Sequence, residues 1–345
     1  MKKRRFRVLA VIAVLFVLTN PQMLIGFKGG GGASPFAGAL VLVTNWADDT
    51  VSLVDLEQEK ELSTIKVGAK PYDVKVDPDG RFAYVTNSAA SDVSVIDIQA
   101  MLESTKIPTG LSPRDIQLSK DGKWAVTANS GDGTISKIDI PARKELFKVK
   151  VGSIPYGVAF SNDEKLALIT NWGENTLSVV DLAAQKEIKR ITIGSLPYTV
   201  VVPEGQKFAA VSSFGSHSIL KVNLDTLEVA STLPVGRSPW GLASSGNGKI
   251  MAAANFSSNE ISVLDAVNFS EKMRVKLNTT SGPSASAGLA AKAKNVASNM
   301  EGTGIVFSDL ANNTISALDV TTGKITNTIK VGKAPYGIAF LPRKK

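Results

Sequence analysis

The chain has 345 residues and no cysteine, which excludes disulfide bonds, thiolate metal sites, iron–sulfur clusters and covalently attached haem. Its formal net charge is +8, but residues 1–39 hold six basic and no acidic side chains, so the rest of the chain carries only +2. A nearly neutral body does not favour a broad phosphate-binding surface, and we expect no nucleic-acid partner.

The amino terminus has the pattern of an export signal. Met1–Arg7 is basic and Val8–Leu18 is an uninterrupted apolar run. As a helix this run spans only about 16 Å of a hydrocarbon core about 30 Å thick. An Ala-Gly-Ala cleavage-site pattern stands at 37–39, after the flexible linker Gly29–Gly32. We expect residues 1–39 to be a signal peptide or a membrane anchor with its linker, and the protein to be periplasmic or at the cell surface.

From Leu40 onward a unit of 42 residues recurs. In one unit, Tyr72–Val76, Phe82–Thr86, Val93–Ile98 and Ser104–Ile107 are short apolar runs separated by turn residues. Four such runs in each unit, with no helical period, predict an all-β repeat array. Each unit opens with a proline: Pro71, Pro113, Pro155, Pro197 and Pro239, then Pro283 and Pro335.

Two polar positions recur in every unit. One ends the second predicted strand, and the other stands ten residues later. Short polar side chains at such places usually bond to nearby backbone, so we interpret these positions as structural. They are Asn45, Asn87, Asn129, Asn171, Ser213, Asn255 and Asp309, followed by Asp55, Asp97, Asp139, Asp181, Asn223, Asp265 and Asp319.

One short motif identifies the repeat. Tyr84-Val85-Thr86-Asn87 is the sequence YVTN, and close variants end at Asn45 and Asn171. Over residues 40–342 the chain resembles the YVTN β-propeller repeat family. The resemblance implies a propeller fold and no particular activity, because that family hosts many functions.

The number of units predicts how the ring closes. The unit that opens at Pro335 has only one strand, Tyr336–Phe340. Its three missing strands, the counterparts of the second, third and fourth runs of the other units, lie at the other end of the chain between Leu40 and Pro71. A composite blade removes the two free edges of an open array. We predict a monomeric, all-β, seven-bladed propeller of four-stranded antiparallel blades over 40–342, with a basic tail at 343–345.

One unit is longer than the others. Asn255 and Asp309 are 54 residues apart instead of 42. The sequence predicts an insertion at 284–303, in which Ala287–Val296 can form a short helix. Such an insertion is either a lid or binding loop, or a solvated excursion.

Aromatic residues gather in two columns. One column follows the opening prolines and the other follows the first polar position, and strand order places both on one face. With the first strand innermost, as the resemblance implies, the first column surrounds the channel mouth and offers a platform for planar, apolar or cationic groups. The alternative is that the rings only pack between blades. The candidate ligand-binding residues are Tyr72, Arg114, Tyr156, Tyr198, Trp240 and Tyr336, with Trp46 and Trp172 from the second column; Ser284 completes the first.

Only weak candidates for catalysis are present. Asp73 and Asp115 follow Tyr72 and Arg114 in adjacent units, where they can act as acid and base, bind a hard cation, or pair with Arg114. His217, the only histidine, lies in a polar loop on the same face. It can serve as a base or an axial haem ligand, although a solvated loop histidine is more common.

These features favour an exported, non-catalytic propeller that binds a small molecule or an envelope protein through its aromatic-lined channel face. We expect no cofactor and no metal, and membrane contact only through the amino terminus. The alternative is an enzyme, a lactonase-like hydrolase, or an accessory subunit of a periplasmic oxidoreductase, because both look similar at the level of the repeat.

Overall fold

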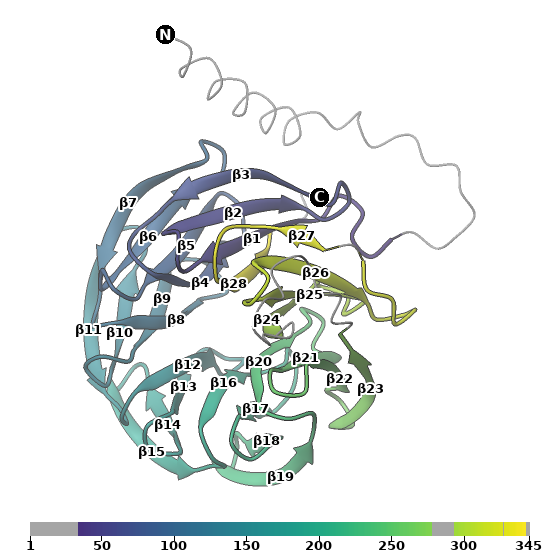
Figure 1. Cartoon of the computed structure of the whole chain (residues 1–345). Coiled ribbons are helices and arrows are strands. Elements are labelled where there is room, and N and C mark those ends of the chain that lie inside the picture. Colours follow the sequence, from purple (N-terminus) through teal and green to yellow (C-terminus); the bar gives the residue numbers. More distant parts are fainter. Residues whose placement is uncertain (1–33, 278–292, 327, 343–345) are drawn as a thin grey trace.

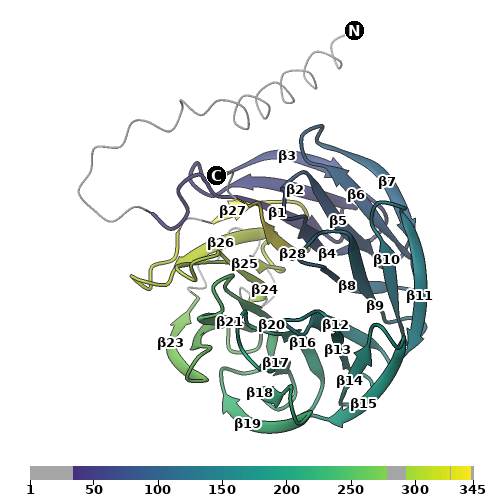
Figure 2. The same ribbon diagram turned by 180° about the vertical axis from the view of Figure 1, so that it is seen from behind.

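The computed structural model describes residues 34–277, 293–326 and 328–342. Within these ranges the chain forms seven four-stranded antiparallel sheets and no helix. The sheets stand as blades around one axis (Figures 1 and 2). The predicted seven-bladed propeller is confirmed. No helix of the described ranges is long and apolar enough to cross a membrane.

The first strand of each sequence unit is the innermost strand of its blade. Every innermost strand contacts the innermost strands of both neighbouring blades, which closes the ring around the channel. Each begins at the opening proline of its unit, except that one begins at an alanine. These strands are β4 (Pro71–Val76), β8 (Pro113–Leu118), β12 (Pro155–Phe160), β16 (Pro197–Val201), β20 (Pro239–Ser244), β24 (Ala293–Ser298) and β28 (Pro335–Phe340).

The two middle strands of each blade form the core. They are almost entirely buried because both of their faces pack against neighbouring blades, which explains their near-continuous apolar sequences. The second strands are β1 (Leu40–Asn45), β5 (Phe82–Asn87), β9 (Trp124–Asn129), β13 (Leu166–Asn171), β17 (Phe208–Ser213), β21 (Ile250–Asn255) and β25 (Gly304–Asp309). The third strands are β2 (Thr50–Asp55), β6 (Asp92–Asp97), β10 (Thr134–Asp139), β14 (Thr176–Asp181), β18 (Ser218–Asn223), β22 (Glu260–Asp265) and β26 (Thr314–Asp319).

The outermost strands face solvent and are mostly polar. In several of them exposed residues alternate with partly buried ones, as expected for a strand with one face in water. They are β3 (Lys60–Lys66), β7 (Leu102–Pro108), β11 (Lys144–Lys150), β15 (Lys186–Thr192), β19 (Glu228–Pro234), β23 (Ser270–Lys276) and β27 (Ile329–Lys330).

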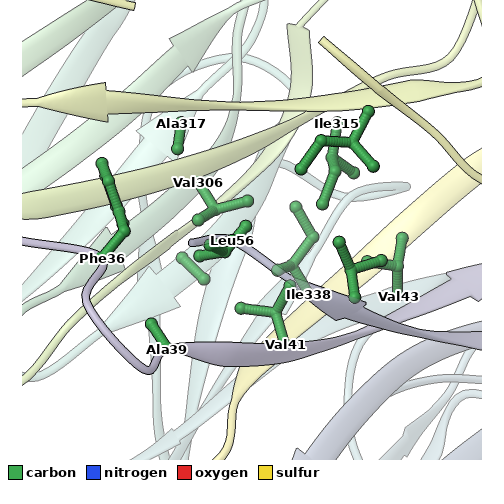
Figure 3. Close-up of a cluster of buried hydrophobic side chains, with 12 residues drawn as sticks. Phe36, Ala39, Val41, Val43, Leu56, Val306, Ile315, Ala317 and Ile338 are labelled. Atoms are coloured by element: carbon green, nitrogen blue, oxygen red, sulfur yellow. The ribbon is translucent and has the colours of Figure 1, made fainter. Parts of the chain in front are cut away.

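The composite closing blade is formed as predicted. Its strand order is β28-β1-β2-β3, so the last strand of the chain pairs antiparallel with the first. Val43 lies opposite Ile338 in this pairing. Side chains of this blade and of the blade of β24 form one buried apolar cluster that includes Val306 and Ile315 (Figure 3).

Residues 34–39, which the sequence places with the amino-terminal linker, pack against the propeller. Phe36 and Ala39 are buried in the same cluster (Figure 3). The backbone N–H of Gly38 donates to Glu57 Oε2 at 2.8 Å. The folded domain therefore includes at least residues 34–39, and the predicted signal segment before them lies outside the described residues.

The recurring polar residues have the structural roles that the sequence analysis assigned to them. Asn171 donates from Nδ2 to Thr176 Oγ1 and Ser178 Oγ, which fixes the hairpin between the second and third strands. Asp181 accepts from the backbone N–H groups of two residues in the turn that leads to the outer strand. Equivalent bonds recur at Asn45 and Asp55 in the closing blade.

The threonine of the YVTN motif connects neighbouring blades. Thr86 Oγ1 accepts from the backbone N–H of Asp73 in its own blade and donates to the backbone carbonyl of Arg114 in the next blade. Thr44 and Thr170 make the same pair of bonds. The hydroxyl therefore also fixes the height at which Asp73 and Arg114 enter the channel.

Thr86→Val is expected to lower the free energy of unfolding by about 1–3 kcal/mol, because it keeps the side-chain volume but leaves a buried N–H and a buried carbonyl unpaired. Urea unfolding measures the change. Thr64→Val is the control, because Thr64 is exposed and bonds only a nearby glutamate. Equal stability of the two variants would contradict the connecting role of Thr86.

The long unit differs from the sequence prediction. β24 occupies 293–298, inside the predicted insertion and over the end of the predicted Ala287–Val296 helix. The added length instead precedes the inner strand: Ala293 follows Lys276 by 17 residues, whereas Pro71 follows Lys66 by 5. The prediction of a helix through Val296 and of an insertion extending to 303 is therefore wrong. Strand pairing with β25 overrides the helix propensity of this alanine-rich stretch.

Candidate functional site

The second residue of each innermost strand projects into the channel. Together these residues form what we call the aromatic layer, and all of them line a cavity of about 390 Å³ within the ring. Six are the predicted members of the first column. The seventh is Lys294 instead of Ser284, because β24 begins at Ala293; Ser284 lies outside the described residues. The layer consists of Tyr72, Arg114, Tyr156, Tyr198, Trp240, Lys294 and Tyr336.

The rings of the layer pack on one another across the channel. The ring centroids of Tyr156 and Tyr198 are 4.2 Å apart, and those of Tyr72 and Tyr336 are 4.5 Å apart. The Tyr72 hydroxyl donates to the Tyr156 hydroxyl at 3.1 Å and also contacts that of Tyr198, although two blades separate β4 from β16. The side chains of the predicted first column are therefore long enough to meet across the channel.

Burial fixes the protonation of the tyrosines. It is the main cause that raises the pKa of Tyr72 and Tyr198 well above the ordinary value, and neighbouring tyrosines add to it. Burial likewise raises the pKa of Tyr336 to about 12. The hydroxyls of Tyr72, Tyr198 and Tyr336 consequently remain neutral donors and acceptors at physiological pH.

Two cations complete the layer. The guanidinium carbon of Arg114 lies 4.8 Å from the ring centroid of Tyr72, and its Nε donates to Ser130 Oγ. Lys294 Nζ lies 3.5 Å from the ring centroid of Tyr336 and 4.1 Å from that of Trp240. Both contacts are cation–π interactions, which gain strength when the cation is withdrawn from water.

The second aromatic column supports the layer from the loops. Trp46 packs 6.3 Å from Tyr336, centroid to centroid, and Phe214 and Phe256 pack 5.5 and 5.2 Å from Trp240. Trp172 is half-buried at the start of the loop after β13. None of these four side chains, including the predicted Trp46 and Trp172, lines the cavity.

A cluster of three charged side chains, Asp73, Lys75 and Asp115, lies next to the aromatic layer, and its two aspartates directly follow Tyr72 and Arg114 in their strands. Lys75 Nζ is 2.6 Å from Asp73 Oδ2 and 3.7 Å from Asp115 Oδ1, so the pairing predicted for Arg114 is made by Lys75. Asp115 also accepts from the backbone N–H groups of Ile116 and Val158. All three charged side chains line the cavity.

The two carboxylates shift the pKa values of this group. Burial and then the charge of Asp73 raise the pKa of Asp115 well above its ordinary value, and the ammonium of Lys75 opposes that rise. Burial lowers the pKa of Lys75, but the two carboxylates outweigh it and the net shift is upward. Lys75 therefore stays charged, while Asp115 holds its proton to higher pH than a solvated aspartate.

His217 is not part of the cavity lining. Its Nδ1 lies 3.1 Å from the backbone nitrogen of Ser238 and 3.1 Å from the backbone oxygen of Phe214. In the preceding blade Asn175 makes the equivalent bond to Leu196 N. His217 thus serves the loop between blades, which is the more common role weighed for it from the sequence.

The sequence analysis missed Lys75 and Lys294. The signal for Lys75 was available, because it stands two residues after Asp73 in a strand and therefore shares its face. Lys294 was hidden by the twelve additional residues of the long unit, which shifted the alignment to Ser284. Within the described ranges no group of three or more side chains has the composition of a metal site.

Comparison with known proteins identifies a matching family and several structures of the same fold. A sequence model of the YNCE-like beta-propeller family matches residues 8–142 and 130–294. No curated protein matches the chain. Three similar solved structures share 15–21% sequence identity with it, which shows a common fold and no more.

Two of these structures are covered almost completely. Hydrazine synthase of Kuenenia stuttgartiensis has 21% identity and a TM-score of 0.68, with 89% of this chain and 99% of that chain covered. A functionally unknown protein from Desulfotomaculum acetoxidans has 18% identity and a TM-score of 0.75, with 87% and 98% covered. The third, dihydro-heme d1 dehydrogenase NirN in complex with DHE, has 15% identity and a TM-score of 0.64, with 93% and 78% covered.

Proposed function

The chain belongs to the YNCE-like β-propeller family, and from the chemistry of its channel we propose that it is an exported, non-catalytic protein that binds a small molecule in the channel cavity. The basic and apolar residues at the amino terminus support export. The family alone assigns no ligand, because one propeller fold hosts many functions.

The observation that carries the proposal is the cavity that the aromatic layer lines. Its volume of about 390 Å³ lies in the range of small-molecule sites. Its lining combines ring faces with a few converging charged groups, Asp73, Lys75 and Asp115 among them. Apolar surface with sparse polar groups is the usual composition of a ligand pocket. That one of the similar structures is a complex with DHE is compatible with ligand binding by this fold.

Tyr156→Ala is expected to weaken ligand binding by about twofold to twelvefold, since one ring contact is worth about 0.5–1.5 kcal/mol. A ligand is first found by thermal-shift screening of the chain from residue 34 onward against lactones, haems, quinones and cell-wall fragments. Calorimetry then compares the variants. Trp124→Phe is the control, because Trp124 packs on Phe160 and does not line the cavity. Equal loss of affinity in both variants would contradict binding at the layer.

The pair Asp73 and Asp115 gives a second candidate function, a lactonase-like hydrolase. The raised pKa of Asp115 beside the carboxylate of Asp73 is suited to a general acid and base. Lactone hydrolysis by the wild-type protein that disappears in Asp73→Asn or Asp115→Asn would support the enzyme. Saturable binding of a lactone with no turnover would support the binding protein.

A further inference from the structure

Neither cation of the aromatic layer forms an ion pair with a carboxylate of residues 34–277, 293–326 or 328–342. Lys294 is only 3% exposed. None of the salt bridges within the described ranges involves Lys294 or Arg114, and the two carboxylates of the channel are held by Lys75. The layer therefore presents positive charge to the cavity.

A buried cation without a counter-ion is costly, and this cost acts on Lys294. Burial, and then the positive charge of Arg114, lower the pKa of the Lys294 ammonium to about 7. Cation–π contacts with Trp240 and Tyr336 offset only part of the lost hydration. A ligand that brings a negative charge to this point attracts the ammonium and so offsets both the cost of its burial and the repulsion from Arg114.

We propose that the channel ligand carries a carboxylate or another oxyanion on a planar body, and that Arg114 and Lys294 bind the anionic group while the rings of the aromatic layer contact the body. This inference rests on the proposed binding function and names the chemical class of its ligand. The guanidinium fork and the ammonium are the side-chain groups that form charge-assisted bonds with oxyanions. The cation–π contacts leave the ammonium N–H groups of Lys294 and the terminal N–H groups of Arg114 available, whereas Arg114 Nε already donates to Ser130 Oγ.

Binding of an anion is linked to a proton on Lys294. The titratable residues on the strands next to Lys294 are Tyr336 on β28 and Asp309 at the end of β25. Across the channel, the positive charge of Arg114 lowers the pKa of Lys294. Tyr336, whose own pKa is raised, stays neutral through this range. Because the anion favours charged Lys294, the affinity is highest below pH 7 and falls as the pH rises through the pKa of Lys294.

The test uses three probes with the same ring and different charge: 2-naphthoate, 2-naphthamide and 2-naphthylmethylammonium. Binding to the chain from residue 34 onward is measured by calorimetry at pH 6 and pH 8, in buffers of different ionisation enthalpy. We expect naphthoate to bind at least tenfold more tightly than naphthamide at pH 6, and proton uptake on binding to be larger at pH 8 than at pH 6, because free Lys294 is mostly neutral at pH 8. The ratio of the affinity for naphthoate to the affinity for naphthamide should be smaller at pH 8 than at pH 6.

Two variants locate the effect. Lys294→Met is expected to reduce the preference for naphthoate at least fivefold and to abolish the proton uptake, and Arg114→Gln to reduce the preference without abolishing the uptake. Lys272→Met is the control, because Lys272 is exposed on the outer strand β23. Thermal unfolding of each variant verifies that it is folded.

The outcomes separate this inference from the proposed function. Equal affinity for all three probes at the layer, or the tightest binding of the ammonium probe, would overturn the anion inference and leave ligand binding intact. Failure of all three probes to bind the folded wild-type protein would count against both. A naphthoate preference that survives Lys294→Met and Arg114→Gln would place the anion elsewhere and overturn the inference.

Discussion

Replacing Ile338 with aspartate is expected to prevent the ring from closing. Ile338 is 6% exposed and packs in the cluster that joins the closing blade to the blade of β24 (Figure 3). The change removes about 1.5–3 kcal/mol of apolar burial and adds a buried charge without a partner, which costs several kcal/mol more. The sum is comparable with the whole stability of a typical domain, about 5–15 kcal/mol.

Loss of β28 also leaves β1 with an unpaired edge, which favours aggregation. We therefore expect little soluble Ile338→Asp protein, no cooperative thermal transition and rapid proteolysis. Lys330→Asp is the matched control, since the same side chain is introduced at an exposed position of β27. If Ile338→Asp melts within a few degrees of the wild-type protein, pairing of the terminal strand with β1 is not what holds the propeller closed.

Replacing Lys75 with methionine is expected to lower the free energy of unfolding by about 2 kcal/mol at neutral pH. Complete loss of one partner from a buried pair costs about 3–5 kcal/mol, and the cost is smaller here because Lys75 is partly exposed. The variant leaves two carboxylates, Asp73 and Asp115, facing each other without their shared cation. Unfolding by urea at several pH values measures the effect.

The sign of the pH dependence follows from the raised pKa of Asp115. Below its unfolded pKa, a carboxyl group whose pKa is raised by folding does not change the free energy of unfolding. As the pH rises from that value toward the folded pKa, the group increasingly lowers the free energy of unfolding. Because Lys75 opposes this rise, its removal enlarges the cost. The deficit of Lys75→Met should therefore be small at pH 4 and large at pH 8.

Asp115→Asn tests the same explanation in combination with Lys75→Met. At the equivalent place in β24, Asn295 Oδ1 accepts from the next backbone N–H as Asp115 Oδ1 does, so asparagine keeps this bond but loses the one that Asp115 Oδ2 accepts from Val158 N–H. The double variant should therefore regain part of the lost stability at pH 8. A deficit of Lys75→Met that is the same at both pH values would show that lost packing, and not charge, is the cause.

The sequence by itself determined the fold. The interval of 42 residues holds from Asn45 to Asn255, and an asparagine ends the second strand in five of the seven units, so a departure in one unit is recognised against the others. The single strand after Pro335 then showed how the ring closes. The structural roles of Asn171 and Asp181 were also predictable, because these side chains bond to residues within a few positions of themselves.

The composition of the first column was predictable for the same reason, apart from one member. Position after the opening proline identified Tyr72, Arg114 and Tyr156 as neighbours on one face. It did not identify Lys294, because the twelve additional residues before β24 break the interval, and only strand pairing with β25 shows where the inner strand begins.

The tertiary structure alone decided what these side chains do. Whether the tyrosines surround an open mouth or meet in the channel depends on the ring diameter relative to side-chain length, which no single repeat encodes. The same holds for the charges: Lys75 pairs with both Asp73 and Asp115, and Lys294 and Arg114 have no described carboxylate at salt-bridge distance. Contacts within a repeat follow from its own sequence, whereas contacts across the channel require the closed ring.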